Sequence, residues 1–244
     1  MKKGLFEITD HRPVARNIFR ICLQGDASGI TRPGQFVNLQ IEGFFLRRPI
    51  SVFDWNNHSL TLIYKAVGKG TELMSRMKPG EKLDILTGLG NGYNLSLSGE
   101  QPLLIGGGVG IPPLYGLAKA LKKENKTVTA VLGFNTAPEV FAVEDFRALG
   151  CDVIVATVDG SCGRKGFVTD VLPESCSYYY ACGPLPMLRS VFRTCSSSGE
   201  FSLEERMGCG FGACMGCSIQ TREGAKRVCR EGPVFRKEEL LWDA

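Results

Sequence analysis

The chain has little histidine and no long stretch of uniform character. Of its 244 residues only two are histidine, His11 and His58, which leaves little material for Ser–His–Asp catalysis or a histidine-rich zinc site. No apolar run approaches the roughly 20 residues that a transmembrane helix needs, and Glu7 and Asp10 interrupt any signal-peptide core. We therefore expect a cytoplasmic protein without a membrane partner.

Charge of a single sign is also scarce. The 29 basic and 25 acidic residues give a formal net charge of +4, and no Lys/Arg run is long enough to bind nucleic acid or anionic lipid. We expect no nucleic-acid partner. The remaining composition, 43% hydrophobic and 22% charged, is that of a globular protein of one or two domains with room for a small extra module.

Cysteine, by contrast, is abundant and unevenly placed. Six of the ten cysteines are scattered singly along the chain, whereas the other four crowd into one short segment, at Cys209, Cys214, Cys217 and Cys229. In a long chain expected in a reducing cytosol, such crowding indicates a metal site and not a disulfide framework. These four residues are our candidate metal ligands.

The spacing of the four cysteines is C-x4-C-x2-C, then eleven residues, then Cys229. Its first part matches plant-type ferredoxins, in which four thiolates hold a [2Fe–2S] cluster. Small residues lie among the ligands and let backbone N–H groups approach the sulfurs. Structural zinc sites more often use two short cysteine pairs. We predict a [2Fe–2S] cluster, with zinc as the alternative.

Residues 1–98 have the pattern of short strands separated by turns. Pro33-Gly34, Asn56-Asn57 and Pro79-Gly80 punctuate them, which favours an antiparallel sandwich or barrel. A helical segment is expected around Thr71–Met77. The strands are expected at Val14–Leu23, Gln35–Ile41, Ile50–Trp55, Ser59–Val67 and Lys82–Leu86.

Residues 99–206 alternate between strands and helices, which predicts a parallel sheet with helices on its faces. Helices are expected after Pro112, at Ala142–Leu149 and at Leu185–Cys195. The expected strands are Pro102–Ile105, Val128–Phe134, Asp152–Thr157 and Tyr178–Ala181, with a further one at Phe201–Arg206. The tail, residues 207–244, is too small for its own apolar core, so we expect a third unit that depends on its metal.

Two segments of the first domain are candidates for binding a phosphate-containing cofactor. The first contains Arg48, Pro49, Ile50 and Ser51, and its arginine is suited to a bidentate phosphate contact. The second contains Ile63, Tyr64, Lys65, Gly70 and Thr71. Gly70 and Thr71 would open a helix whose free N–H groups attract phosphate, and Tyr64 would stack on, or hydrogen-bond to, a flavin. The alternatives are a surface arginine and a tyrosine packed in the sheet.

The glycine run Gly106–Gly110 is the candidate nucleotide site of the second domain. It follows a strand and precedes a helix, as phosphate binding requires, and within it we single out Gly107, Gly108 and Gly110. The run is neither a P-loop nor a Rossmann fingerprint, and a tight strand–helix turn is the alternative. Cys182, Gly183 and Pro184 follow a later strand, where Cys182 would approach a nicotinamide.

In order and spacing, these motifs resemble the ferredoxin–NADP reductase superfamily over most of the chain. The resemblance implies an FAD-binding antiparallel β-barrel over residues 1–98 and an NAD-binding α/β domain with a parallel sheet over residues 99–206. The cysteine module, residues 207–244, narrows the resemblance to the electron transfer subunits of dihydroorotate dehydrogenase B. Leu89–Tyr93, Asp159–Ser161 and Gly163–Gly166 resemble those subunits as well.

This resemblance implies three cofactors and a partner. FAD and a [2Fe–2S] cluster would be resident, and NAD would be a substrate. The partner would be the FMN-containing catalytic subunit that oxidises dihydroorotate in pyrimidine biosynthesis, in a heterotetramer of two subunits of each kind. This chain shows no orotate site, so we do not expect it to oxidise dihydroorotate alone. Arg48 would bind the FAD pyrophosphate, Ser51 the flavin end, Gly70 and Thr71 a phosphate, and the glycine run NAD.

Two other interpretations remain open from the sequence. Similar flavin and iron–sulfur subunits serve hydrogenases, sulfide dehydrogenases and ferredoxin:NADP reductases. A zinc-stapled nucleotide-binding regulator without redox activity is the second interpretation. Within the first, Asp159 would favour NAD over NADP, because a carboxylate repels a 2′-phosphate.

Overall fold

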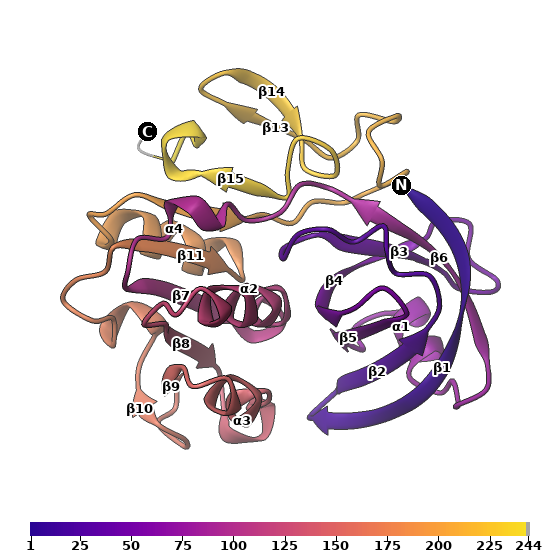
Figure 1. Cartoon of the computed structure of the whole chain (residues 1–244), viewed down its shortest axis with the longest axis horizontal. Coiled ribbons are helices and arrows are strands. Elements are labelled where there is room, and N and C mark those ends of the chain that lie inside the picture. The colour runs from indigo at the N-terminus through magenta and orange to yellow at the C-terminus, as the bar shows by residue number, and fades with distance from the viewer. Residues whose placement is uncertain (243–244) are drawn as a thin grey trace.

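Six antiparallel strands in the first part of the chain close into a barrel (Figure 1). The computed structural model describes residues 1–242, and the strand order around the barrel is β1-β2-β5-β4-β3-β6. Alternate side chains point inward, as on β6, where Leu83 and Ile85 are buried in the barrel core. The strands span Lys2–Ala15 (β1), Ile18–Gln24 (β2), Phe36–Gln40 (β3), Arg48–Trp55 (β4), Ser59–Lys65 (β5) and Lys82–Leu89 (β6), and helix α1 spans Lys69–Met74. The predicted antiparallel barrel is confirmed.

One strand prediction in the barrel was wrong. A single strand was expected over Val14–Leu23, but β1 ends at Ala15 and β2 begins at Ile18. Asn17 has a φ of 59°, a left-handed conformation that asparagine tolerates and that turns the chain into a hairpin. The long strand β1 was not expected at all, because it is half exposed and mixes charged residues with apolar ones such as the exposed Leu5 and the buried Phe6.

The second part of the chain forms a seven-stranded sheet in the order β10-β9-β8-β7-β11-β12-β15. Six of its strands run parallel, which confirms the predicted parallel sheet. They are β7 (Pro102–Gly107), β8 (Thr129–Phe134), β9 (Asp152–Thr157), β10 (Arg164–Lys165), β11 (Tyr178–Cys182) and β12 (Gly199–Ser202). The helices are α2 (Pro112–Lys123), α3 (Val143–Ala148) and α4 (Leu185–Thr194), and short 3₁₀ turns lie at Leu95–Leu97, Gly108–Gly110, Ala137–Glu139, Val168–Asp170 and Lys237–Glu239.

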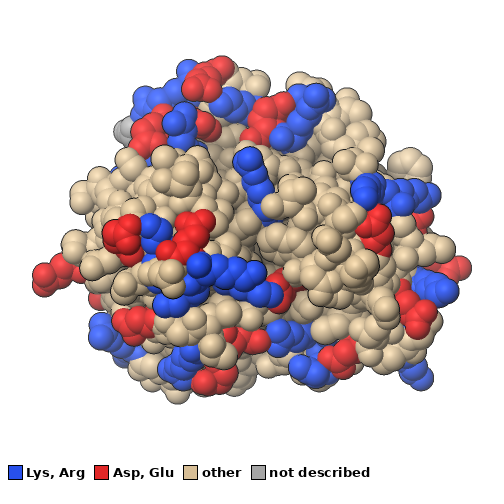
Figure 2. Space-filling model, in the orientation of Figure 1, with Lys and Arg blue, Asp and Glu red and all other residues tan. Residues whose placement is uncertain are grey.

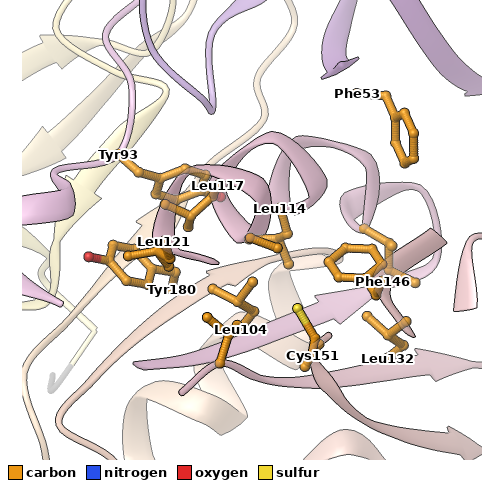
Figure 3. Close-up of a cluster of buried hydrophobic side chains, with 14 of the residues drawn as sticks. Phe53, Tyr93, Leu104, Leu114, Leu117, Leu121, Leu132, Phe146, Cys151 and Tyr180 are labelled. Carbon is orange, nitrogen blue, oxygen red and sulfur yellow. The ribbon is translucent and has the colours of Figure 1, made fainter. Parts of the chain in front are cut away.

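Helix α2 follows the glycine run and joins the sheet to the barrel (Figure 3). Two prolines open it. The N–H groups of the first turn have no partner within a helix, so the N–H that proline lacks is not missed there. Leu114, Leu117 and Leu121 recur at helical spacing and are fully buried. On the barrel side, Phe53 of β4 stacks on Tyr115 of α2 with ring centroids 4.1 Å apart. The two domains therefore share one apolar core.

The C-terminal segment returns to the sheet of the second domain. Strand β15 (Val234–Arg236) pairs antiparallel with β12, whereas β13 (Ser218–Thr221) and β14 (Gly224–Arg227) form a separate hairpin. The strand expected at Phe201–Arg206 was wrong in its bounds, because β12 ends at Ser202 and the chain leaves the sheet there. Val234–Arg236 thus form the edge of a sheet whose first strand in the sequence begins at Pro102.

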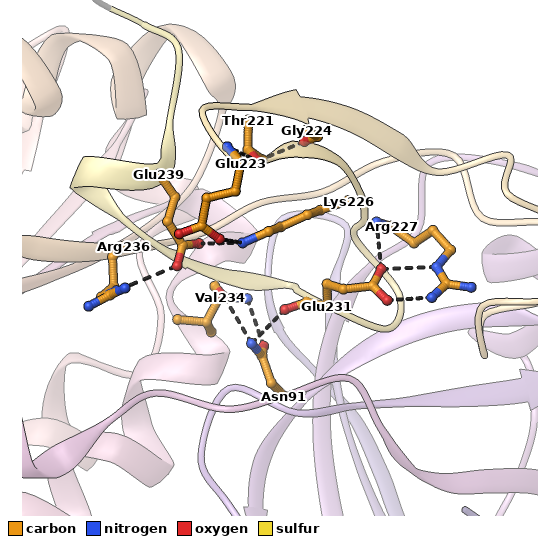
Figure 4. A network of polar contacts seen from close by, with 10 residues as sticks. All are labelled: Asn91, Thr221, Glu223, Gly224, Lys226, Arg227, Glu231, Val234, Arg236 and Glu239. Atoms are coloured by element: carbon orange, nitrogen blue, oxygen red, sulfur yellow. Dashed lines mark hydrogen bonds and ion pairs between the residues drawn. The ribbon is translucent and has the colours of Figure 1, made fainter.

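Asn91 ties the end of the barrel to this returning segment (Figure 4). Its Nδ2 donates to the carbonyl oxygens of Glu231 at 2.7 Å and Val234 at 3.0 Å, and its Oδ1 accepts from the Val234 N–H. The Asn91 N–H also donates to the Gly232 carbonyl. Arg227 and Glu231 form an ion pair beside it. One asparagine therefore fastens the end of the barrel to the C-terminal segment that completes the sheet.

The surface carries charges of both signs. On the face drawn in Figure 2, basic and acidic side chains lie interspersed, so no field of a single sign extends across it. Among residues 1–242, none of the helices is both long and apolar enough to cross a membrane.

Candidate functional site

A cleft of about 700 Å³ lies between the barrel and the carboxyl ends of the parallel strands. The carboxyl edge of a parallel sheet is where nucleotides bind in such folds. Nine of the residues predicted from the sequence line this cleft, namely Pro49, Ser51, Lys65, Gly107, Gly108, Gly110, Cys182, Gly183 and Pro184. The structure therefore brings the first barrel motif and both nucleotide motifs to one place.

The two nucleotide motifs touch each other at Gly110. A methyl group on Gly110 would lie 2.5 Å from both the carbonyl carbon of Cys182 and the Cα of Gly183. Backbone cannot move aside as a flexible side chain can, so only glycine permits the glycine run and the Cys182–Pro184 loop to meet. This contact sets the width of the cleft where they meet.

We expect Gly110→Ala to impair NADH use severely while FAD stays bound. The added methyl would force the two loops apart, and displacing a bound substrate by about 1 Å costs up to roughly a hundredfold in rate. Steady-state NADH:dye reduction, with FAD content measured in parallel, checks this. Gly4→Ala is the matched control, because its methyl meets only Phe6, at 3.5 Å. An NADH KM and kcat equal to wild type would contradict the assignment.

Arg48, Gly70 and Thr71 lie together beside the cleft, although none of them is part of its lining. Gly70, in α1, lies so close to Arg48 that a methyl group there would be 2.6 Å from the guanidinium Nε. The guanidinium also lies over the Phe44 ring, 4.7 Å from its centroid, and donates to the Leu46 carbonyl. The Thr71 hydroxyl accepts from the Val67 N–H at 3.1 Å and so orders the start of α1. Arg48 and the start of α1 thus adjoin one another, as a shared phosphate would require.

The two residues before Lys65 point elsewhere. Ile63 is 3% and Tyr64 2% exposed, and the Tyr64 hydroxyl is 2.9 Å from Nε2 of His11. Burial raises the pKa of Tyr64 well above its usual range. Its ring belongs to the core of the barrel, so stacking of this ring on a flavin does not agree with its position. A cofactor contact from Ile63 or Tyr64 would have to come from the backbone. Lys65 does face the cleft, 3.9 Å from Glu139.

Cys182 lies at the end of β11, on the floor of the cleft. Burial raises the pKa of its thiol to about 12, so the sulfur stays protonated and uncharged at neutral pH. Sequence reasoning missed its neighbours Ser202, Glu204 and Glu205, which also line the cleft. Ser202 ends β12 and the two glutamates follow it, and β12 is parallel to β11, so the rule that ligands bind at the carboxyl edge would have found them.

Glu200, beneath this floor, gives the protein a pH-dependent stability. The side chain is 4% exposed and accepts from the Asn94 N–H at 2.9 Å, and burial raises its pKa to about 7. Between its ordinary pKa of 4.5 and 7, the folded protein holds a proton that the unfolded chain has released. Stability therefore falls as the pH rises through this window, by about 3 kcal/mol at most.

We expect Glu200→Gln to be more stable than wild type at pH 8 and to lose this advantage toward pH 5. Glutamine keeps the acceptor for Asn94 but has no charge to bury. Urea unfolding of both proteins at pH 5, 6.5 and 8 measures the difference. A difference that is the same at all three pH values would show that the carboxyl group does not titrate in this range.

The four cysteines of the C-terminal module form two pairs. The Cys209 N–H donates to Sγ of Cys214 and the Cys214 N–H to Sγ of Cys209, both at 3.4 Å. The Cys229 N–H donates to Sγ of Cys217, also at 3.4 Å. Cys217 and Cys229 are 1% and 2% exposed, whereas Cys214 is exposed. One pair is thus buried in the shared core, and the other reaches the surface.

Backbone amides prepare the surface pair for a metal. Burial raises the pKa of Cys209, but hydrogen bonds from the N–H groups of Phe211, Cys214 and Ala213 outweigh it and lower the pKa to about 6. A thiolate at neutral pH is the form that binds metal. Such N–H bonds to sulfur also tune a cluster's potential.

The pairing favours two iron ions over one zinc ion. A mononuclear zinc site needs four ligands around one point. A [2Fe–2S] cluster is larger and takes two thiolates per iron. Two cysteine pairs, linked by hydrogen bonds within each pair, fit the latter.

Comparison with known proteins agrees with both parts of the site. Residues 204–241 match the family described as the iron–sulfur cluster binding domain of dihydroorotate dehydrogenase B, and residues 104–193 match the oxidoreductase NAD-binding domain. The dihydroorotate dehydrogenase B (NAD(+)) electron transfer subunit of Geobacillus sp. (strain WCH70) is 44% identical, with 99% of each chain covered. The chain belongs to this family of electron transfer subunits. Its Fusobacterium nucleatum relative is 40% identical, with 96% of each chain covered.

Solved structures show that this electron transfer subunit has a ferredoxin reductase-like fold. The NADH-dependent reduced ferredoxin-NADP oxidoreductase is 33% identical with a TM-score of 0.88, covering 98% of this chain and 91% of the other. The ferredoxin NADP+ reductase of Neisseria gonorrhoeae, solved with bound FAD and NADP, has a TM-score of 0.67 at 18% identity, covering 80% and 90%. The latter likeness shows the shared barrel and sheet fold. The subunit thus has the fold for FAD, a [2Fe–2S] cluster and NAD.

Proposed function

We propose that this subunit carries electrons from an FMN-containing, dihydroorotate-oxidising subunit through a [2Fe–2S] cluster and FAD to NAD, in pyrimidine biosynthesis. The observation that carries the proposal is that the paired cysteines and the nucleotide cleft belong to one packed unit. Cys217 and Cys229 share an apolar core with Phe36 and Ala181, and Phe36 lines the cleft.

The chemistry explains why the chain needs two resident groups. When bound, the cluster supplies one-electron transfer and the flavin supplies both one- and two-electron transfer. Oxidation of dihydroorotate to orotate releases two electrons and two protons, and NAD takes up the two electrons with one proton. The chain's own residues bind and orient. Arg48 holds the pyrophosphate of FAD, Gly70 and Thr71 a phosphate, and Ser51 the flavin end.

The exposed Cys214 indicates which side meets the partner. A carrier outside the chain reaches the cluster most closely where its ligands reach the surface, and Cys214 is the exposed ligand. We propose a heterotetramer of two of these subunits and two FMN-containing catalytic subunits. We also propose the reducing cytoplasm as its location, because none of the cysteines in the described residues is paired in a disulfide.

We propose three units: the FAD barrel at residues 1–98, the NAD domain at 99–206 and the cluster module at 207–244. The cluster module also supplies β15, the edge strand of the NAD domain's sheet.

Asp159 supports NAD over NADP. Hydrogen bonds from the Ser161 hydroxyl and N–H lower the pKa of Asp159. It is therefore ionised and, as the residue after Val158, which lines the cleft, it would repel a 2′-phosphate. Equal dye reduction with NADH and NADPH would remove this preference.

Co-purification tests the proposal. The chain is expressed with a candidate dihydroorotate-oxidising subunit, and absorption spectra are recorded before and after dihydroorotate is added. We expect the flavin and cluster bands to bleach and NAD to be reduced only in the complex. Unchanged bands in a complex that retains both groups would overturn the dihydroorotate assignment, while the chain alone reduced by NADH would still establish an NAD-linked electron carrier.

A second candidate function, that of a flavin and iron–sulfur subunit of a ferredoxin:NADP reductase, is favoured by one comparison. The structural similarity to the NADH-dependent reduced ferredoxin-NADP oxidoreductase extends over 98% of this chain. In that case, the partner would be another flavoprotein and dihydroorotate would bleach nothing. The higher identity, 40–44%, to dihydroorotate dehydrogenase B subunits favours the first function.

A further inference from the structure

Asn38 is a polar residue in the middle of an apolar strand of the barrel. Its neighbours Val37 and Leu39 point into the barrel core, whereas Phe36 and Asn38 point outward. Phe36 lines the nucleotide cleft. Asn38 nevertheless is only 1% exposed. Some other part of the chain therefore covers it.

The covering segment is the cluster loop, residues 208–217. Asn38 Nδ2 donates to the carbonyl oxygen of Cys209 at 3.2 Å, across 171 positions of sequence. The next residue, Gly210, lies against the same amide, and a methyl group there would overlap Nδ2. Gly210 also has a φ of +78°, which other residues rarely adopt. The first cysteine of the cluster is thus fixed directly onto β3.

At this point β3 pairs along one edge with β4, which carries the first barrel motif, Arg48–Ser51. Asn38 pairs in register with Pro49 of β4, which lines the cleft. Arg47 holds the same place, because its Nη1 donates to the Asn38 carbonyl at 3.3 Å and its Nη2 to Asp84 at 2.7 Å. The side-chain amide of Asn38 therefore connects the backbone at Cys209 to the strand pair that borders the cleft.

Stability alone does not account for an asparagine here. Its Oδ1 is buried and has no hydrogen-bond partner among the described residues. A buried polar atom without a partner costs at least as much free energy as the one bond to Cys209 returns. An apolar side chain of the same shape would fold as well. The contribution of the amide therefore lies in holding the backbone at Cys209 in place.

We propose that Asn38 is a positioning residue that fixes the cluster loop against the flavin barrel and so sets the path for electrons between the two groups. This inference rests on the proposed function, in which the cluster and FAD exchange electrons. Without the bond from Asn38, the Cys209 end of the loop would be free to move away from β3.

The test uses the loaded full-length protein with Asn38→Leu and Asn38→Asp. Leucine removes the amide but keeps the bulk, and aspartate keeps the shape but replaces the N–H donor. Gln40→Leu is the matched control, because Gln40 lies on the same strand and, within the described residues, donates to backbone in its own loop, at Ile41 and Phe44.

Two readouts separate positioning from general stability. In stopped flow, we expect NADH to reduce FAD at the wild-type rate, while the following cluster reduction slows several-fold, because electron transfer between two groups slows steeply as the distance between them grows. By hydrogen–deuterium exchange, amides of residues 209–214 should exchange faster in both Asn38 variants, without a matching fall in the melting temperature of Asn38→Leu. Gln40→Leu should change neither readout.

The outcomes are distinct. Wild-type exchange in the cluster loop of both Asn38 variants would overturn the inference, and so would wild-type cluster reduction. Exchange is measured whether or not electrons flow, so it decides the role of Asn38 alone. If NADH never reduced the cluster of the wild-type protein, the proposed function would fail while faster exchange in the variants still supported Asn38 as the anchor of the loop.

Discussion

Replacing Cys214 by serine is expected to abolish electron exchange with the partner while FAD stays bound. Cys214 is the exposed ligand, and its sulfur accepts the Cys209 N–H. A serine hydroxyl is not deprotonated at neutral pH and is a poor iron ligand, so the cluster would be lost or bound unstably. The flavin site lies in another part of the chain and should continue to take electrons from NADH.

Three measurements on the Cys214→Ser protein check this result. Iron and flavin contents are compared, NADH:dye reduction reports the flavin, and dihydroorotate:NAD activity with the partner reports the whole path. Cys22→Ser is the matched control, because Cys22 lies on β2 and belongs to no cysteine pair. Full dihydroorotate:NAD activity in Cys214→Ser would place the cluster off the electron path.

The second large effect is expected at Arg48. Arg48→Ala should weaken FAD binding by about 2–3 kcal/mol, or roughly 30- to 150-fold, because a charged hydrogen-bonded contact to phosphate is lost. The guanidinium is held in advance by the Phe44 ring and the Leu46 carbonyl, so it loses little freedom on binding. Folding should be little changed, because Arg48 forms none of the ion pairs within the described residues.

Titration of flavin-free protein with FAD measures this effect. Arg48→Lys is the matched variant, because it keeps the charge but loses the planar fork that grips two oxygens. It should bind FAD with an affinity between those of wild type and Arg48→Ala. FAD affinity equal to wild type in Arg48→Ala would show that the pyrophosphate lies elsewhere.

Local patterns predicted most strands and the meeting of the motifs. The strands at Gln35–Ile41 and Asp152–Thr157 alternate or run apolar as buried strands do, and β3 and β9 lie there. The rule that ligands bind at the carboxyl edge of a parallel sheet predicts Gly107 and Cys182 in one site, and both line the cleft. These inferences need only the nearest residues and one topological rule.

Features that depend on distant contacts could not be predicted in this way. The direction of the Tyr64 ring depends on which face of β5 the closed barrel encloses. Strand β15 has only three residues and exists because the edge of β12 accepts it. From its neighbours in the sequence, Asn38 is expected to be exposed on a strand. A loop 171 residues later covers it. No pattern within a short window contains that information.

The antiparallel pairing of β15 on β12 constrains how the subunit is made in the cell. The ribosome releases all four cysteines before β15, so the ligands emerge while the edge of β12 is still bare. Exposed strand edges promote aggregation. The chain segment that protects this edge also closes the path from the last cysteine back to the sheet. Loss of β15 (Val234–Arg236) would therefore expose the edge of β12 in the nucleotide domain as well as disturb the segment that follows the last cysteine.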